Sequence, residues 1–557
     1  MQLVDDLKGE IVANDTANAN GVATQIRRHT AAAKTAVNDP VWVLASSIPG
    51  LGPNLSAVSE MARSADDVAT LGLTPLTQVI DSLDWDTLLP GDSPTNLAPL
   101  EAASPAIVSA AQAVRSSAER LEGIDSSRLV PQLADPLEEA RSQLRSVTGA
   151  LDASADASKL LPSMLGSQGP KNYLLMVQNN AEARASGGIP GALAVLSFDK
   201  GKLTLSAQNS AANVGAMSPI LPIDAEQKNI YSGRLGKYMQ DVNLTPDFPT
   251  AATLATEMWN RKTGQRVDGV LSIDPVALSY ILKVTGPVTI KSHGLQPLTE
   301  LGLPSELNEQ NVVQTLLSDV YAKIEKPEQQ DIYFAGVAQE IFRALSSGKG
   351  DAKLLVEGIS QATAEGRVLV WSGTAGDQTT ISKYPLSGSV TGVSISPAQF
   401  GVYFNDGTGA KMDYYLKRTV QLIKECPKDG YEQTTVRITS KNTAPSDAAT
   451  SLAPYVTGGG EYGIPPGTVQ TNIVAYGPVQ ALVESANENG QKIAFAPHLH
   501  ANRPVGVIAQ RLAPGESKTV EFTFGKIVQH TEPELDVTPS VQPVKEVKLP
   551  TKLAPCQ

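Results

Sequence analysis

Residues 267–290 read VDGVLSIDPVALSYILKVTGPVTI, and this stretch decides the class of the fold. GVLSI is a short apolar run typical of a buried strand, and Asp274 followed by Pro275 is a helix-start signal. VALSYILKV has one apolar face, Gly286 can end the helix, and PVTI begins another strand. A strand, a short helix and a strand in succession predict an α/β layered domain.

The neighbouring sequence extends this domain over residues 166–384. YLLMVQ, at 173–178, is a continuous apolar strand of the kind that is buried on both faces. Further strands are expected at GALAVLSFD and KLTLSAQN, and amphipathic helices at PTAATLATEMWNRKT and NEQNVVQTLLSDVYAKI.

The regions on either side follow other patterns. Residues 1–165 are rich in Ala, Ser, Leu, Asp and Glu, and Pro/Gly clusters divide them into about four helices of a bundle or stalk. Apolar residues recur there at spacings of three, four and seven, as in Leu137, Leu144, Val147 and Leu151. Residues 385–530 contain seven or eight short strands separated by turn residues, which predicts an immunoglobulin-like or related β-sandwich. Residues 531–557 are a Pro/Lys/Val-rich tail, and the whole chain is predicted to be a multidomain α+β protein.

Composition narrows the classes of partner. The chain has 557 residues, 41% of them hydrophobic, and a net charge of −12. Residues 1–165 hold 21 acidic and 11 basic side chains, so most of the negative charge belongs to the helical region. Such a surface is a poor partner for nucleic acid. No window approaches about 18 uninterrupted apolar residues, so the sequence as given predicts no membrane-spanning segment.

The densest polar cluster follows the YLLMVQ strand, in QNNAEARASGGIPG at 178–191. A loop at this point could present Arg184 and backbone N–H groups to a phosphate or pyrophosphate, with Glu182 orienting Arg184 or holding a cation. The candidate ligand-binding residues of this loop are Asn179, Asn180, Gly187 and Gly188. The structural alternative is a polar turn whose amides and ion pair hold a loop together.

A second polar cluster is RLGKYMQDVNLTPDFP at 234–249. Arg234 and Lys237 are candidate ligand-binding cations, and Asp241 with Asn243 could hold Mg²⁺ through oxygen ligands. A solvated loop is the alternative for this pair. Asp247 is expected to cap the helix that begins near Pro249.

The chain has two cysteines, Cys426 and Cys556. Cys556 lies one residue from the end of the tail, so a disulfide would staple that tail to the domain that holds Cys426. This pairing favours an extracytoplasmic protein, whereas two free thiols would fit a reducing cytosol.

These residues resemble a known family. LLPSMLGSQGPKNYLLMVQNNAEARASGGIPGALAVLSFDKGKL is similar to the signature of domain-of-unknown-function family 4012, which is bacterial and abundant in actinobacteria. DVNLTPDFPTAA, the stretch at 267–290 and GVYFNDGTGAKMDYYL resemble its later segments, so the resemblance covers about residues 160–530. Members usually begin with a cytoplasmic stub and one transmembrane helix. This implies that the chain is the extracytoplasmic part of a membrane-anchored precursor, connected with cell-surface polysaccharides.

A second resemblance, in layout, is to the LytR–CpsA–Psr domain, whose enzymes transfer glycopolymers from a polyprenyl-pyrophosphate carrier with Mg²⁺. It implies that Arg184, Glu182 and Asp241 would be catalytic, with Glu182 and Asp241 as the Mg²⁺ ligands. That family has a Ser-Ile-Pro-Arg-Asp motif after its third strand, whereas this chain reads LSAQNSAANV there, so Arg234 or Lys237 would have to replace the missing arginine.

Two functions follow as hypotheses. The first is a non-catalytic envelope protein that binds a glycan or a polyprenyl-linked glycan in polysaccharide assembly. The second is a LytR–CpsA–Psr-like phosphotransferase that attaches glycopolymers to the cell wall using Mg²⁺. An apolar tunnel beside Arg184, wide enough for a prenyl chain, would favour recognition of the lipid carrier in either case.

Overall fold

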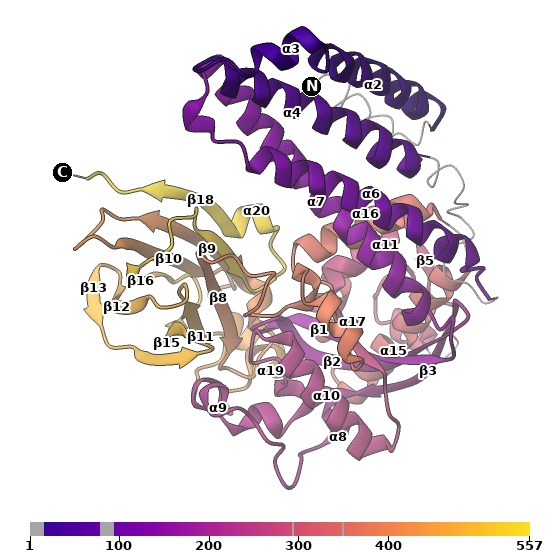
Figure 1. The fold of residues 1–557 in the computed structure, drawn as a ribbon. Coiled ribbons are helices and arrows are strands. Elements are labelled where there is room, and N and C mark those ends of the chain that lie inside the picture. Colours follow the sequence, from indigo (N-terminus) through magenta and orange to yellow (C-terminus); the bar gives the residue numbers. More distant parts are fainter. Residues whose placement is uncertain (1–15, 78–93, 292–294, 348–349, 557) are drawn as a thin grey trace. The chain divides into compact units, whose positions relative to one another are not determined.

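The structure is a computed structural model, and it describes residues 16–77, 94–291, 295–347 and 350–556. The chain divides into two compact units (Figure 1). The first contains the N-terminal helices together with residues 199–202, and the second contains the sheets and the remaining helices. No helix in the described ranges has the length and the apolar character needed to cross a bilayer.

The first unit is helical, as the sequence predicts. Its helices are α2 (Thr16–Val37), α3 (Pro40–Ala45), α4 (Gly52–Asp67), α6 (Ala98–Glu122) and α7 (Pro131–Met164). A π-helical segment, Val68–Leu73, continues α4, and a 3-10 turn, Ser126–Arg128, precedes α7. Small apolar residues of α6 pack around Val114 against Leu151 and Ala155 of α7. The predicted apolar stripe is confirmed at Leu137 and Leu151, which are both buried.

The second unit has a mixed five-stranded sheet near its N-terminal end, in the order β3-β2-β1-β4-β7. The strands are β1 (Lys171–Arg184), β2 (Gly187–Asp199), β3 (Lys202–Ser210), β4 (Gly269–Ile273) and β7 (Leu369–Ser372). β1 pairs antiparallel with β2 and parallel with β4, and β7 is antiparallel to β4. The sequence therefore predicted an α/β sheet correctly, and the long β1–β2 hairpin lies at its centre.

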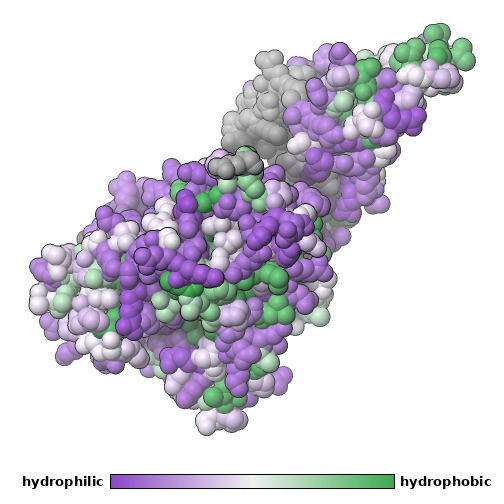
Figure 2. Space-filling model, turned by 90° about the vertical axis from the view of Figure 1, so that its left-hand side faces the viewer, coloured by the Kyte–Doolittle hydropathy of each residue, from purple (hydrophilic) through white to green (hydrophobic). Residues whose placement is uncertain are grey.

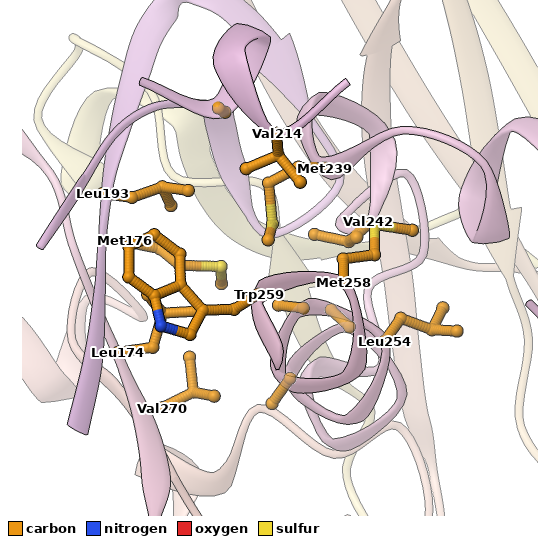
Figure 3. Packing of buried hydrophobic residues seen from close by; sticks show 14 of the residues in the cluster. Leu174, Met176, Leu193, Val214, Met239, Val242, Leu254, Met258, Trp259 and Val270 are labelled. Atoms are coloured by element: carbon orange, nitrogen blue, oxygen red, sulfur yellow. The ribbon is translucent and has the colours of Figure 1, made fainter. Parts of the chain in front are cut away.

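Helix α10 (Phe248–Thr263) packs on this sheet (Figure 3). Trp259 of α10 lies against Leu174 and Met176 of β1, and Met239 and Val242 close the cluster. Asp247 accepts a hydrogen bond from the backbone N–H of Thr250 at 3.2 Å, so the predicted cap of this helix is confirmed.

Helix α11 (Pro275–Thr285) has the predicted ends. Asp274 accepts a hydrogen bond from the N–H of Ala277 at 2.8 Å, and Gly286 follows the helix with φ +77°, a conformation that favours glycine. The strand expected next is β5 (Val288–Thr289), but it pairs with β6 (Glu306–Leu307) in a separate ribbon. The predicted order of strand, helix and strand is therefore confirmed, and the second strand lies outside the five-stranded sheet.

Two further helices, α15 (Pro327–Ser346) and α16 (Ala352–Ala364), belong to this unit. Its short helical elements are α8 (Ala211–Val214), α9 (Ala225–Tyr231), α12 (Gln296–Thr299), α13 (Val312–Gln314), α14 (Val320–Lys323), α17 (Ala375–Ile381), α18 (Ala448–Ser451), α19 (Pro454–Thr457) and α20 (Val544–Val547). A π-helical segment, Thr315–Asp319, joins α13 to α14. Single 3-10 turns lie at Gly233–Gly236, Met239–Asp241, Pro385–Ser387 and Met412–Tyr415.

The C-terminal part of the second unit is a sandwich of two sheets, which confirms the predicted all-β region. One sheet has the order β13-β12-β16-β10-β9-β18, and the other β14-β15-β11-β8-β17. The strands are β8 (Gln399–Asp406), β9 (Leu416–Lys424), β10 (Glu432–Asn442), β11 (Val469–Tyr476), β12 (Leu482–Glu488), β13 (Gln491–Ile493), β14 (Ala496–His500), β15 (Arg503–Leu512) and β16 (Ser517–Ile527). Phe400 and Phe404 of one sheet pack with Phe522 and Phe524 of the other in the shared core.

The Pro/Lys/Val-rich tail is structured, which its composition did not predict. Its strands β17 (Glu534–Val537) and β18 (Lys548–Leu553) pair parallel with β8 and β9 and form one edge of each sheet. The tail thus completes both layers of the sandwich.

Cys426 and Cys556 form the predicted disulfide, with their Cα atoms 5.5 Å apart. Cys426 lies just beyond the end of β9, and Cys556 just beyond its neighbour β18. The bond closes a loop with a sequence separation of 130 residues and so holds the last strand on the sheet.

Loss of this bond is expected to destabilise the second unit. In Cys556→Ser, the free energy of unfolding should fall by about 2–5 kcal/mol, because the cross-link no longer restricts the unfolded chain. Urea unfolding of the oxidised protein measures the change. The control is Cys426→Ser/Cys556→Ser with and without reductant. A reductant effect on this double variant as large as that on the native chain would contradict the prediction.

Candidate functional site

The polar stretch after YLLMVQ is a buried hairpin, and the prediction of a loop there is wrong. β1 continues to Arg184, a two-residue turn follows, and β2 starts at Gly187. Two register shifts, between Val177 and Gln178 and between Asn179 and Ala183, accommodate the polar residues within the strand. Polar residues can occupy such a strand because their side chains find hydrogen-bond partners inside the protein.

Gly187 and Gly188 are needed here for close backbone approach. Gly187 has φ +139°, and a Cβ atom on Gly188 would lie 2.2 Å from the carbonyl carbon and oxygen of Asn179. The N–H of Gly188 donates to Gln178 Oε1 at 2.7 Å. The two glycines therefore allow the strands of the hairpin to meet.

The amide side chains of the hairpin are also engaged. Gln178 Nε2 donates to Ser272 Oγ at 2.5 Å, and Asn180 Nδ2 donates to Asp274 Oδ2 at 3.1 Å. Asn179 Nδ2 donates to the hydroxyl of Tyr321. Asn243 is fully buried, and its Nδ2 donates to the carbonyl of Gly188 at 2.8 Å, so the expected solvated loop is instead part of the core.

The tip of the hairpin packs on the β-sandwich. The N–H of Ala183 donates to Asp413 Oδ2, and the N–H of Ala185 donates to Asn405 Oδ1, both at 2.9 Å. The hydroxyl of Thr538, in the tail, donates to the carbonyl of Ala185 at 2.8 Å. The sandwich therefore satisfies the backbone of the tip on both sides of Arg184.

The charged residues of the tip form an alternating ion-pair chain. Arg184 Nη2 lies 2.9 Å from Glu182 Oε1 and 3.3 Å from Asp241 Oδ1. Lys411 Nζ contacts the other oxygen of Glu182, and Arg234 Nη2 lies 2.8 Å from Asp241 Oδ2. Arg234 has 57% of its side chain exposed, whereas the other four side chains are buried. The chain thus runs from the surface at Arg234 to Lys411 in the interior.

The electrostatics of this chain favour the charged forms. Burial alone would raise the pKa of Glu182, but Lys411 and Arg184 outweigh it and hold that pKa below its usual value. Burial alone would lower the pKa of Lys411, but Glu182 outweighs it and raises that pKa. The buried charges of Glu182 and Lys411 are therefore maintained by their neighbours.

Two more buried charged residues, Asp413 and Arg418, and the partly buried Asp406 lie in the sandwich beside the tip, and the sequence analysis missed them. Arg418 Nη2 lies 2.6 Å from Asp413 Oδ1, and the Arg418 guanidinium is 4.4 Å from the ring centre of Phe404. Asp406 accepts hydrogen bonds from the backbone N–H groups of Thr408 and Gly409 at 3.0 and 2.6 Å. Burial, with the nearby carboxylates Asp413 and Glu182, raises the pKa of Asp406 to about 7. The signal was present in FNDGTGAKMDYYL, where polar residues follow a buried strand.

The arrangement around Glu182 and Asp241 does not fit a magnesium ion. Arg184 lies between the two carboxylates and pairs with both, and their remaining oxygens meet Lys411 and Arg234. A divalent cation would lie against these positive groups. Across the described residues, no three His, Cys, Asp or Glu side chains come together as a metal site.

A cavity of about 80 Å³ opens beside Lys411, at the far end of the ion-pair chain. Its wall combines three tyrosines, two serines and Lys411 with five aliphatic residues; these residues are Tyr321, Tyr414, Tyr415, Ser318, Ser451, Lys411, Leu317, Ala322, Leu452, Ala453 and Val456. Lys411 Nζ lies 5.8 Å from the ring centre of Tyr321 and 5.6 Å from that of Tyr455. The volume of the cavity is well below the roughly 300–1,000 Å³ of typical small-ligand pockets, so it has room for only a small part of a ligand. No sequence motif marks it, because its residues come from three distant segments.

The other two predicted ligand-binding cations lie elsewhere. Arg234 and Lys237 flank Tyr238, with Arg234 Cζ 5.0 Å and Lys237 Nζ 5.3 Å from its ring centre. Arg234 is thus linked through its ion pair with Asp241 to Arg184 and Glu182. Lys237 contacts the same Tyr238 ring as Arg234 does and is not part of these ion pairs.

Residues 168–321 match the family described as "Protein of unknown function (DUF4012)". No curated protein matches the chain significantly.

The pairing of Lys411 with Glu182 predicts a strong stability effect. In Lys411→Met, Glu182 keeps its burial but loses one of its two cations, so the free energy of unfolding should fall by about 3–5 kcal/mol. The matched control is Glu182→Gln/Lys411→Met, in which the carboxylate charge is removed as well. Urea unfolding should show a loss smaller than the sum of the two single variants. Additive losses would contradict the coupling.

Asp406 predicts a pH-dependent stability. Its pKa is raised from the ordinary 3.8 to about 7, so the folded protein retains a proton that the unfolded chain has lost in this range. The stabilisation is fully present below about pH 4 and is lost as pH rises through about 7, with a slope of at most about 1.4 kcal/mol per pH unit. Asp406→Asn should remove this slope in unfolding curves recorded between pH 5 and 8. An unchanged slope in that variant would assign the pH dependence to another group.

Proposed function

Since residues 168–321 match the DUF4012 family, whose description gives no activity, we propose from the site that this is a non-catalytic protein of the extracytoplasmic cell envelope. It binds a glycan, free or polyprenyl-linked, during the assembly of a cell-surface polysaccharide. The observation that carries this proposal is the tyrosine-lined cavity beside Lys411.

The chemistry of the cavity suits one sugar unit. A sugar ring has apolar C–H faces and a rim of hydroxyl groups. The rings of Tyr321, Tyr414 and Tyr415 offer flat apolar surface, and the hydroxyls of Ser318 and Ser451 offer hydrogen bonds. Because the cavity is small, we expect it to take one residue of a longer glycan, whose remainder stays in solvent.

The state of the buried charges supports binding rather than transfer. A general acid, a general base or a phosphate clamp must reach the reacting atoms. Glu182, Arg184 and Asp241 are buried and pair with one another and with Lys411 and Arg234. These groups hold the hairpin tip in place, and a substrate would have to displace them from each other.

The disulfide supports the extracytoplasmic location. Cys426 and Cys556 are bonded in the structure, and such bonds persist in oxidising compartments. The membrane anchor in a longer precursor is part of the same proposal, and it rests on the family resemblance.

One observation favours the phosphotransferase alternative. Arg234 and Lys237 gather two cations at Tyr238, and Arg234 leads through Asp241 to Arg184. Arg234 would pair with the phosphates of a polyprenyl pyrophosphate bound there. It would take the place of the motif arginine of the LytR–CpsA–Psr family, which LSAQNSAANV lacks.

Binding of oligosaccharides tests the main proposal. We expect a soluble oligosaccharide from a panel of bacterial surface polysaccharides to bind the native chain in calorimetric titrations. Tyr414→Ala and Tyr415→Ala should each weaken it by about tenfold or more, since each removes an aromatic face. The matched control is Tyr431→Ala, which removes a partly exposed tyrosine that does not line the cavity.

Two outcomes would contradict this proposal. One is that no member of the panel binds the folded protein, and the other is that Tyr431→Ala weakens binding as much as the cavity variants do.

Titration with a polyprenyl pyrophosphate, with and without Mg²⁺, tests the phosphotransferase alternative. Two results together would favour the transferase hypothesis over the binding hypothesis. The native chain would bind the pyrophosphate and Arg234→Ala would not, and the native chain would transfer the glycan to an acceptor.

A further inference from the structure

The helical unit has an exposed apolar tip between α2 and α4. Figure 2 shows hydrophobic residues gathered at one end of this unit. From 48% to 75% of each residue at the tip is exposed, and these residues are Val41, Val43, Leu44, Ile48 and Leu51. Apolar residues exposed to this degree in one short segment mark an interaction surface.

The tip is held by hydrogen bonds within its own helical unit. Asp39 caps α3 by accepting a hydrogen bond from the N–H of Val41 at 2.8 Å. Trp42 Nε1 donates to Ser59 Oγ of α4 at 2.8 Å, which fixes α3 on that helix. The N–H of Gly52 donates to the carbonyl of Ile48 at 2.7 Å and closes the turn. The exposed side chains therefore have a defined support and are presented together.

The tip is also free of charge. Residues 40–59 read PVWVLASSIPGLGPNLSAVS, and the first charged residues on either side are Asp39 and Glu60. The surrounding unit is acidic, with 21 acidic and 11 basic side chains in residues 1–165. A charge-free apolar tip matches the hydrocarbon boundary of a lipid bilayer, where a charged group would be costly.

The size of the tip argues against a second copy of the chain as its partner. Five partly exposed aliphatic side chains offer on the order of 400 Å², whereas a stable dimer buries about 800 Å² on each partner. Shallow insertion of apolar side chains into a bilayer needs no matching surface of that size.

We propose that this tip, residues 40–51, inserts its exposed apolar side chains into the interfacial region of a lipid bilayer. Its partner is an uncharged, zwitterionic lipid surface, because the acidic unit around it is repelled by anionic lipids. This contact lies on the helical unit and is independent of the glycan site.

Flotation of the full chain with phosphatidylcholine vesicles tests the proposal. We expect the native chain to bind, and Val43→Ser/Leu44→Ser to lose about a hundredfold of its partition, since each side chain contributes on the order of a tenfold change. The matched control is Leu354→Ser/Val356→Ser, which removes two exposed apolar residues of α16 and should bind as the native chain does. Added phosphatidylglycerol should reduce binding, and salt should restore it.

A second readout does not depend on the Ser variants. Brominated phosphatidylcholine should quench tryptophan fluorescence in the native chain and less so in Trp42→Phe, because Trp42 lies at the base of the tip. The proposal is overturned if the native chain does not float with the vesicles, or if both double variants lose binding equally. It is also overturned if Val43→Ser/Leu44→Ser abolishes a dimer of the native chain while vesicle binding is unchanged.

Discussion

The structure of the second unit depends on the burial of one polar hairpin tip against a β-sandwich. Two backbone N–H groups of the tip donate to Asp413 and Asn405, and Glu182, just before the first of them, pairs with Lys411. Buried charges are costly unless they are paired, so this contact exists only when hairpin and sandwich meet in one register. A shift of the tip would separate Glu182 from Lys411 and would remove the N–H of Ala183 from Asp413 Oδ2. The five-stranded sheet and the sandwich are joined by this constraint in one compact unit.

The tail follows from the same constraint. Thr538 closes the contact by donating to the carbonyl of Ala185, and β17 before it forms the edge of the sheet that carries Asn405. The disulfide then fixes the end of the chain beyond β18. A segment whose composition resembles a linker thus completes the surface on which the tip rests. Its Pro and Lys residues are compatible with this role, because β17 and β18 are edge strands.

Local chemistry could be predicted from the sequence, and distant pairing could not. The caps at Asp247 and Asp274, the buried stripe of α7 and the strands of the sandwich depend on residues a few positions apart. The disulfide was predictable because the chain has only two cysteines. The polar stretch after Gln178 looked like a loop because its partners lie far away: Asp413 is 230 residues from Ala183, and Thr538 is 353 residues from Ala185. The tyrosine-lined cavity was missed for the same reason.

The pairing of charges also bears on the choice between binding and transfer. A residue that stabilises a buried contact through its charge cannot lose or exchange that charge without cost to the fold. Arg184 and Glu182 are in this position, since each holds the other and a second charged neighbour. Arg234 is different, because its guanidinium is mostly exposed and reaches only one end of the ion-pair chain. The groups with freedom to meet a ligand therefore lie at the two ends of that chain, at Arg234 on the surface and at the tyrosine-lined cavity beside Lys411.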